Sequence, residues 1–549
     1  MANAGRPATY HPVMPATPFT ATQDRHDDDG DALYLALKTR DARFDGRFFT
    51  AVTSTGIYCR PVCSVKTPKR ENCRFFDHAA QAEAAGFRPC LRCRPELAPQ
   101  TRTWSIQDAS SILAQQAARL LDEPEAWAEQ AVTVEALAAR IGISDRHLRR
   151  IFEAQFGISP LQYLQTRRLL TAKQLLADTD LSMPLVALAS GFASVRRFNA
   201  AFLAHYRLNP TQLRRAGASE GSGGQGAIGN AVKLGYRPPY DVAAMMAFFR
   251  KRRVAQVEWV ADETAAPAIA RTLRLDVGGT SLTGWLRLDF DETRHQVLLR
   301  TSESLRVALP QVIRRVRALL DLDADPEAIH AVLHDRFPDG AGLRVPGTVD
   351  GFELAVRAVL GQQITVAAAR TLAQRLVDRF GTPIETPWPH LCRLFPTPAA
   401  LAELGAAAGD ALGQLGIVRQ RQAAIVALAQ AVHQGRLRIH AGADLAATVD
   451  LLNSLPGIGD WTAQYIAMRA LRWPDAFPAG DVALHKALGV QGDGQPARAA
   501  EAASRAWQPW RSYAVLRAWA ELPVAVPKDT GKTRGRKTVP NEDNQPTKD

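Results

Sequence analysis

Five of the six cysteines of this chain lie in one short segment, and four of these five form two closely spaced pairs. The first pair is Cys59 and Cys63 in "TGIYCRPVC", and the second is Cys90 and Cys93 in "FRPCLRC". The amino terminus lacks the apolar block of a secretory signal, so we expect the reducing environment of the cytoplasm. Clustered thiols in such a compartment hold metal more often than they form disulfides, and two cysteine pairs complete the tetrahedral ligand set that Zn²⁺ prefers. The spacing therefore predicts a small domain built around one Zn²⁺.

The length and charge of the chain suggest several domains and a polyanionic partner. A chain of 549 residues is longer than one hydrophobic core usually supports. Lysine and arginine number 67 against 55 acidic residues, which gives a formal net charge of +12. Such a balance favours polyanions, and nucleic acid is the commonest of these. No apolar run of about 18 residues is present, so we expect no membrane-spanning segment.

An internal repeat lies in the region that follows the cysteines. Each copy has a small apolar helix, a glycine at a turn (Gly142 or Gly191) and a serine suited to cap the next helix. The matching positions are Ser144, Arg146, Phe152, Phe156, Ile158 and Pro160, then Ser194, Arg196, Phe202, Tyr206, Leu208 and Pro210. This is the pattern of a helix-turn-helix, present twice.

The second helix of each copy has a polar face outside its apolar stripe. Arginine and asparagine can read base edges in the major groove, although the same face suits a solvated bundle that binds nothing. The candidate DNA contacts are Arg146, Arg149, Arg150, Arg196, Arg197 and Asn199. The paired units resemble the DNA-binding module of AraC-type regulators, which implies that they bind successive major grooves of one DNA site.

The cysteine segment resembles the amino-terminal domain of the adaptive-response protein Ada, over "DGRFFTAVTSTGIYCRPVCSVKTPKRENCRFF" and "EAAGFRPCLRC". The resemblance implies that Cys59 is a zinc ligand and also a nucleophile, which takes a methyl group irreversibly from a methyl phosphotriester of DNA. Cys63, Cys90 and Cys93 would be the other ligands, whereas Cys73 has no ligand role in the pattern. Spacing alone favours a purely structural zinc site, which holds a small domain together. Lys66 and Arg70 are candidate phosphate contacts.

The resemblance to Ada does not extend to its second acceptor cysteine. No "PCHR" block, which carries that residue in Ada, is present, and "HLCRLF" around Cys392 lacks the pattern. We therefore assign Cys392 no chemistry and expect no repair of O6-alkylguanine.

The distal half contains "LPGIGDWTAQYIAMRAL", a glycine turn that leads into a helix. Backbone N–H groups at such a turn suit a phosphate, which makes Gly457 and Gly459 candidate DNA contacts. "PDAFPAGDVALHKAL" follows, and the pair resembles the helix-hairpin-helix glycosylase superfamily. "YRPPYDVAAMMAFF", "GLRVPGTVDGFELAVRAVLGQQITVAAA" and "RAWQPWRSYAVLRAW" resemble one branch, 3-methyladenine DNA glycosylase II of the AlkA type.

The resemblance to AlkA-type glycosylases implies roles for several residues of the distal half. Asp481 matches the catalytic carboxylate, which would stabilise the positive charge that develops on the sugar when an N-glycosidic bond breaks. Trp461, Tyr465 and Trp519 match base-pocket positions, although each also suits core packing. Gln363 occupies the position that wedges into the duplex. A monovalent cation at the hairpin is a further candidate cofactor.

Two departures from related patterns refine the expected activity. Relatives that also cut the strand have a lysine where this chain has Trp461, so we expect a monofunctional enzyme that leaves an abasic site. Asp460 stands where some relatives carry a basic residue, which is unfavourable beside a phosphate unless the side chain points away or caps the helix.

These observations predict a multidomain α+β chain. It would combine a small zinc-bound α/β domain, an all-α double helix-turn-helix, a mixed α/β subdomain and an all-α helix-hairpin-helix domain. The expected boundaries are disorder over 1–30, the Ada-type zinc domain over 31–100, the AraC-type domain over 104–215, a flexible linker over 216–232, the AlkA-type α/β subdomain over 233–341, the glycosylase domain over 342–525 and a disordered tail over 526–549.

The expected function joins DNA alkylation repair to its regulation. The chain would excise alkylated purines such as 3-methyladenine, and methylation of Cys59 would activate sequence-specific transcription control. Its partner would be double-stranded DNA, both alkylated and promoter DNA, with RNA polymerase a candidate protein partner; we expect a monomer whose halves act semi-independently across the linker. Two alternatives are a methylation-triggered transcription factor whose distal half only binds DNA, and a glycosylase whose zinc domain is purely structural.

Overall fold

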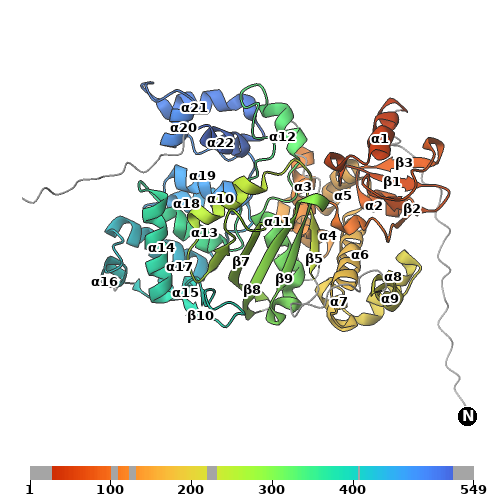
Figure 1. Ribbon diagram of the computed structural model, residues 1–549, viewed down its shortest axis with the longest axis horizontal. Helices are drawn as coiled ribbons and strands as arrows, with labels where there is room; N and C mark the ends of the chain where they lie inside the picture. The colour runs from red at the N-terminus through yellow and green to blue at the C-terminus, as the bar shows by residue number, and fades with distance from the viewer. Residues whose placement is uncertain are drawn as a thin grey trace, which may run out of the picture.

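The computed structural model describes residues 27–99, 109–122, 132–218, 231–277, 279–405 and 408–522. Figure 1 shows the cysteine-containing domain and the glycosylase-like helices at opposite ends of the molecule, with a five-stranded sheet between them. No helix in these ranges has the length and hydropathy needed to span a bilayer. The expected multidomain α+β organisation is confirmed.

The first domain is a four-stranded sheet of order β3-β1-β2-β4. Its core is small and aromatic, with Phe49, Tyr58 and Phe87 buried around the sheet. Strands β1 and β2 are antiparallel, whereas β2 and β4 run parallel with Tyr58 opposite Pro89. The elements are α1 (Asp27–Thr39), β1 (Phe49–Val52), β2 (Ile57–Cys59), β3 (Cys73–Phe76), α2 (Ala79–Ala84), β4 (Arg88–Pro89) and the 3₁₀ turn η3 (Pro95–Leu97).

The second domain consists of the predicted pair of helix-turn-helix units, joined by the long helix α6. Gly142 and Gly191 take the left-handed conformation at the turns, with φ of +74° and +80°. Ser144 and Ser194 cap the following helices, and each accepts a backbone N–H at 3.3 Å. The helices are α3 (Ala109–Asp122), α4 (Val134–Ile141), α5 (Asp145–Phe156), α6 (Pro160–Asp178), α7 (Met183–Ala189), α8 (Val195–Tyr206) and α9 (Pro210–Ala218).

The third unit is an antiparallel sheet of order β5-β9-β8-β7-β6 with helices packed on it. Alternate residues of β8 are buried (Gly284, Leu286 and Leu288), whereas β7 is buried at all of its first six positions, 268–273. The elements are β5 (Val232–Gly235), α10 (Val242–Arg252), β6 (Glu258–Val260), β7 (Ala268–Val277), β8 (Thr280–Asp291), β9 (Gln296–Thr301), α11 (Leu309–Leu319) and α12 (Pro326–Leu333).

The fourth unit is a helical domain around the largest apolar cluster of the described residues. The only strands within it, among the residues described, form the short pair β10 and β11. The elements are α13 (Gly351–Leu360), α14 (Val366–Phe380), β10 (Thr382–Pro383), β11 (Arg393–Leu394), α15 (Pro398–Ala402), α16 (Ala408–Gly413), α17 (Arg419–His433), α18 (Leu445–Ser454), α19 (Asp460–Arg469), α20 (Val482–Ala487), α21 (Pro496–Ser504) and α22 (Arg511–Ala520).

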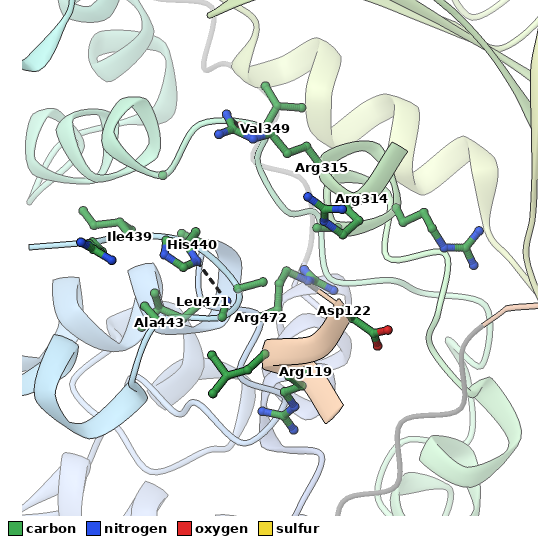
Figure 2. A pocket seen from close by; sticks show the side chains of 18 of the residues that line it. Arg119, Asp122, Arg314, Arg315, Val349, Ile439, His440, Ala443, Leu471 and Arg472 are labelled. Carbon is green, nitrogen blue, oxygen red and sulfur yellow. Dashed lines mark hydrogen bonds between the residues drawn. The ribbon is translucent and has the colours of Figure 1, made fainter. Parts of the chain in front are cut away.

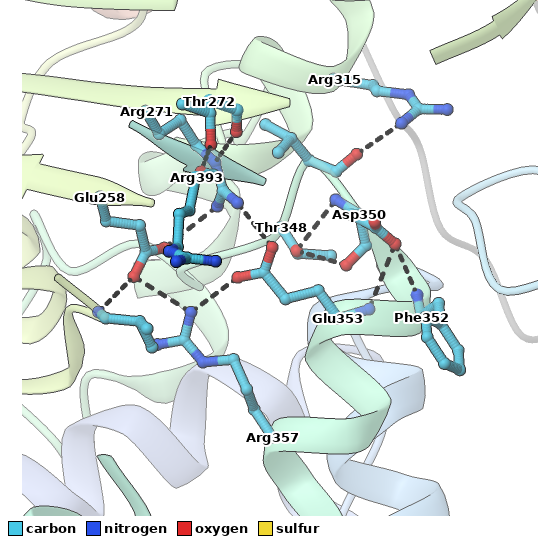
Figure 3. Close-up of polar contacts among 12 residues, drawn as sticks. Glu258, Arg271, Thr272, Arg315, Thr348, Asp350, Phe352, Glu353, Arg357 and Arg393 are labelled. Carbon is cyan, nitrogen blue, oxygen red and sulfur yellow. Dashed lines mark hydrogen bonds and ion pairs between the residues drawn. The ribbon is translucent and has the colours of Figure 1, made fainter. Parts of the chain in front are cut away.

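A buried ionic network ties the five-stranded sheet to the helical domain (Figure 3). Arg271 of β7 donates to Glu258 at 3.0 Å and to Glu353 of α13 at 2.6 Å. Arg357 also donates to both glutamates, at 3.1 Å to Glu258 and 2.8 Å to Glu353. Burial would raise the pKa of Glu258, but Arg357 and Arg271 outweigh it and hold that pKa below its usual value. Glu258 therefore stays charged, and the network fixes α13 against the sheet.

The zinc and helix-turn-helix domains pack against the distal half of the chain. Buried residues of α6, α7 and α8 share one apolar cluster with the five-stranded sheet. Lys173 of α6 is buried and donates to the carbonyl of Cys90 at 3.0 Å. The two halves therefore share an apolar core, whereas their semi-independent action stays a prediction. Three expected boundaries also shift, because α1 begins at Asp27, α9 continues to Ala218, and the described chain resumes at residue 231 with β5 from Val232. The rest of the predicted amino-terminal disorder, linker and tail lies outside the described residues.

Arg237 is the most buried charged side chain at this junction, with no exposed surface. Its guanidinium donates to the carbonyl oxygens of Asp45 (2.7 Å) and Pro99 (3.2 Å) in the zinc domain. It also donates to those of Asp323 (2.9 Å) and Ala324 (3.1 Å) in the loop before α12. Burial lowers the pKa of Arg237 to about 10, so the group is still charged at neutral pH. One side chain thus satisfies four carbonyl groups from two domains.

Replacing Arg237 with methionine is expected to lower the free energy of unfolding of the protein by about 3 kcal/mol, because four buried carbonyl groups at the junction would lose their hydrogen-bond donor. The measurement is urea denaturation followed by tryptophan fluorescence. Arg253→Met is the control, since Arg253 is exposed at the end of α10. Equal midpoints for the two variants would show that Arg237 does not hold the junction.

Candidate active sites and zinc centre

The four paired cysteines meet at one end of the small sheet. Cys59 is the last residue of β2 and Cys90 directly follows β4, and the parallel register places Tyr58 opposite Pro89. Cys59 and Cys90 therefore lie side by side, and a backbone bond from Cys90 N–H to Tyr58 O (2.9 Å) holds them there. The sulfur atoms of Cys59, Cys63, Cys90 and Cys93 all lie within 4.8 Å of one another.

This geometry fits one Zn²⁺. Zinc–sulfur bonds of about 2.3 Å in a tetrahedron separate the sulfurs by roughly 3.8 Å, which is compatible with this cluster. Hydrogen bonds among the thiols split their pKa values, which rise for Cys59 and Cys93 and fall for Cys63 and Cys90. All four can be thiolates at neutral pH only if a cation compensates their charge. The predicted zinc cofactor is confirmed.

The surroundings of the four thiols are asymmetric. Cys59, Cys63 and Cys90 are buried, whereas Cys93 is partly exposed. The backbone N–H of Arg60 donates to Cys93 Sγ at 3.3 Å, and the guanidinium of Arg60 forms an ion pair with buried Asp45. Cys73 stands apart, because its thiol donates to Lys69 O at 3.3 Å and burial raises its pKa.

The residues of the first half that we expect to contact DNA phosphates and bases differ in their exposure and in whether they already form an ion pair. Lys66 is exposed, whereas Arg70 forms an ion pair with Asp31 at 2.8 Å and lies over the ring of Phe75. All six expected readout residues of the two second helices are exposed, namely Arg146, Arg149, Arg150, Arg196, Arg197 and Asn199. Glu135 accepts from Arg149 at 3.3 Å, a surface contact that a phosphate or base could replace.

In the distal half, Asp481 lies at the first turn of α20, half-buried, with three N–H donors around its carboxylate. The backbone N–H of Leu484 donates to Oδ1 at 2.7 Å, so Asp481 also caps α20. Trp461 Nε1 donates to Oδ2 at 2.8 Å, and Trp519 Nε1 donates to Oδ1 at 3.1 Å. These three donors fix the orientation of the carboxylate.

The aromatic residues expected to line a base pocket do gather beside Asp481. Trp461 and Tyr465 are stacked, with ring centroids 5.4 Å apart and an interplanar angle of 9°. Arg469 donates to Tyr465 Oη at 2.6 Å. Burial would raise the pKa of Tyr465, but Arg469 and Arg252 lower it below its usual value. Sequence reasoning missed the indole N–H donors and Arg469, because nothing in the sequence pairs a tryptophan with a distant acid.

The glycine turn joins α18 to α19 as a helical hairpin. Gly457 has φ of +74°, and a side chain there would meet Ala424 and the carbonyl of Gln420, so glycine is required. Gly459 caps α19 with open space around it. Asp460 is exposed and accepts from Gln464 at 3.4 Å, away from Asp481. Gln363 is also exposed, with φ of +54°, in the loop between α13 and α14.

A cavity of about 1540 Å³ lies elsewhere, between α3, α11 and the loop that follows α17 (Figure 2). Arg119, Arg315, Arg472 and His440 are among its lining residues, and the close-up shows them on different elements. Asp481 and the stacked aromatics do not line it. The cavity marks the junction of domains and is separate from the carboxylate site.

Four family models match successive parts of the chain. They describe the metal binding domain of Ada (residues 32–96), a helix-turn-helix domain (137–216), the AlkA N-terminal domain (231–350) and the HhH-GPD superfamily base excision DNA repair protein (356–512). The resemblances to Ada, to the AraC-type module and to the AlkA-type glycosylase are all confirmed, and the helix-turn-helix and glycosylase domains make this a DNA-binding protein.

Relatives match the whole chain and its parts. A Mycobacterium tuberculosis protein described as a bifunctional transcriptional activator/DNA repair enzyme AlkA is 37% identical over 503 residues, which cover 90% of this chain and 97% of that protein. DNA-3-methyladenine glycosylase 2 of Escherichia coli is 34% identical over 52% of this chain and 95% of its own length. The Ada protein of Escherichia coli is 38% identical over 30% of this chain and 42% of its own length. The chain therefore belongs to the family of bifunctional transcriptional activator/DNA repair enzymes AlkA, in which an Ada metal binding domain and a helix-turn-helix domain precede an AlkA-type glycosylase.

Proposed function

We propose that the distal half is a monofunctional DNA glycosylase that excises alkylated purines, with Asp481 as its catalytic carboxylate. The observation that carries this proposal is the half-buried acid held by two indole N–H groups beside a stacked aromatic pair. Such an arrangement offers fixed negative charge next to flat, electron-rich faces, which suits a cationic base that has left the stack.

The reaction balances with water as the only co-reactant. The bond between C1′ and the base nitrogen breaks, and its electron pair leaves with the base. The Asp481 carboxylate faces the positive charge that builds on the sugar and orients the water that attacks C1′. The water gives its proton to solvent as the new C1′–O bond forms. Trp461 offers no amine at the place where strand-cutting relatives have a lysine, which supports a product that is an abasic site in an intact strand.

We propose that the zinc domain takes a methyl group from a methyl phosphotriester onto Cys59. The sulfur–methyl bond forms as the oxygen–methyl bond breaks, and the electron pair returns to the phosphate oxygen as a normal diester anion. A bound Zn²⁺ keeps the acceptor sulfur deprotonated at neutral pH. With Zn²⁺ bound, the thiolates of Cys59, Cys63, Cys90 and Cys93 together with the ion would carry two net negative charges, and methylation of Cys59 would leave one. The change removes repulsion from the DNA backbone, which supports a role as a switch for promoter binding.

The partner in both reactions is double-stranded DNA, read at promoters through α5 and α8. RNA polymerase is the protein partner we propose for the activated state, and we propose that the chain acts as a monomer in the cytoplasm. A cation at the hairpin carbonyl groups remains a candidate, and Gly457 and Gly459 are the residues that would hold it and the phosphate.

A single assay tests the proposed glycosylase. The chain is incubated with duplex DNA that carries one 7-methylguanine, and free base and strand breaks are measured separately. We expect release of base, and strand breaks only after alkali treatment. No release of base would leave the distal half as a DNA clamp, and breaks without alkali would overturn the monofunctional assignment.

A further inference from the structure

The loop between α13 and α14 holds two glutamines with different surroundings. Gln363 is exposed and left-handed, and it is the residue expected to wedge into the duplex. Gln362, its neighbour, is half-buried and turned back into the domain. Its side chain reaches the glycine hairpin, which is distant in sequence, whereas that of Gln363 faces solvent.

The contacts of Gln362 are specific in their hydrogen-bond direction. Its Nε2 lies 2.9 Å from the carbonyl oxygen of Gly457 and 2.9 Å from Thr462 Oγ1. A carbonyl oxygen only accepts, so the amide nitrogen must face the hairpin. Thr462 is itself buried, in the first turn of α19, directly after Trp461. One amide group thus links the loop that contains Gln363, the glycine hairpin and helix α19, which carries Trp461 and Tyr465.

The main chain of Gln362 is held from a second direction. The guanidinium of Arg421, in the first turn of α17, donates to the carbonyl oxygen of Gln362. Gly361, just before it, ends α13, and Thr365, just after the loop, caps α14. The backbone of Gln363 is therefore fixed through its neighbour, in a left-handed conformation that costs free energy for a residue other than glycine.

We infer that Gln362 is a positioning residue for base extrusion, which locks the wedge at Gln363 to the phosphate-binding hairpin. This inference rests on the proposed glycosylase function. Extrusion of a base from the duplex is energetically unfavourable. The side chain that fills the space left by the base must therefore be held in place while the base leaves the stack. Gln363 fills such a gap with less stacking surface than an aromatic or large apolar side chain, so its effect depends on being held in place.

The test separates extrusion from chemistry. Two DNA substrates carry the same 7-methylguanine, one paired with cytosine and one in a short unpaired bubble, and base release is followed in single turnover. For Gln362→Leu we expect the rate on the paired substrate to fall about 10-fold or more, and the rate on the bubble to stay within about 2-fold. A role limited to stability would lower both rates together.

Two further variants sharpen the result. Gln374→Leu is the matched control, because Gln374 is a half-buried glutamine of α14 that donates only within its own helix, to Asp378 at 2.9 Å, and the variant should leave both rates unchanged. Thr462→Val removes one of the two acceptors at nearly constant volume and should give a smaller loss on the paired substrate only. It also carries the test if Gln362→Leu does not fold. An unchanged ratio of paired to bubble rates in folded variants overturns the inference, whereas no release by the wild type from either substrate overturns the proposed function instead.

Discussion

An Asp481→Asn variant is expected to release alkylated purine about 100-fold to 1,000-fold more slowly than the wild type. The substitution keeps the size of the side chain and leaves an oxygen to accept the Leu484 N–H that caps α20. It removes the negative charge and presents an amide N–H₂ to one of the two indole donors. Both changes act against a transition state with a cationic sugar. The measurement is the single-turnover rate of base release from DNA carrying one 7-methylguanine.

Binding of DNA should respond in the opposite direction. Loss of one negative charge at the proposed active site reduces repulsion of the DNA backbone, so the Asp481→Asn variant should bind the lesion duplex at least as tightly as the wild type. Asp460→Asn is the matched control, because it makes the same charge change on the adjoining helix without touching Asp481. An Asp481→Asn variant that excises as fast as Asp460→Asn would remove Asp481 from the chemistry.

The local features of the zinc and helix-turn-helix domains could be predicted from the sequence because short-range rules determine them. Cysteine spacing predicted four ligands, and the parallel register of β2 with β4 places Cys59 beside Cys90. A glycine at each turn and a serine after it predicted both helix-turn-helix units, and these residues adopt the conformations that the rules require. In each case the residues that decide the geometry lie within a few positions of one another.

The junctions between domains could not be predicted, because they depend on pairings between distant residues that look alike in the sequence. Arg237 is one of 67 basic residues, and nothing near it shows that Asp45 and Ala324 supply its acceptors. The same holds for Trp519, whose indole reaches Asp481 from another helix. The flexible linker expected over 216–232 suggested halves that act semi-independently, yet apolar residues of α6 and α8 lie in one apolar cluster with the sheet. The composition of a linker indicates how flexible that linker is. Whether the domains that it joins pack together depends on the apolar surface that those domains can bury against each other.

Cys59→Ser is expected to abolish methyl uptake from DNA that carries methyl phosphotriesters. A serine hydroxyl is a far weaker nucleophile than a thiolate at neutral pH, and we propose the acceptor role for Cys59 alone among the cysteines of this chain. The measurement is intact mass and peptide mass after incubation, together with the zinc content of each protein. Cys73→Ser is the control, because Cys73 is buried in the same domain outside the four-sulfur cluster and should leave uptake at the wild-type level.

The methylated wild-type protein should then bind promoter DNA more tightly, by roughly 3-fold to 10-fold at moderate salt, because one negative charge near the backbone has been removed. The gain should shrink as salt rises, since screening weakens the repulsion that methylation relieves. The Cys59→Ser protein should show no change after the same treatment. A methyl group found on another cysteine would reassign the acceptor, and an equal affinity before and after methylation would leave the zinc domain as a repair unit without a switch.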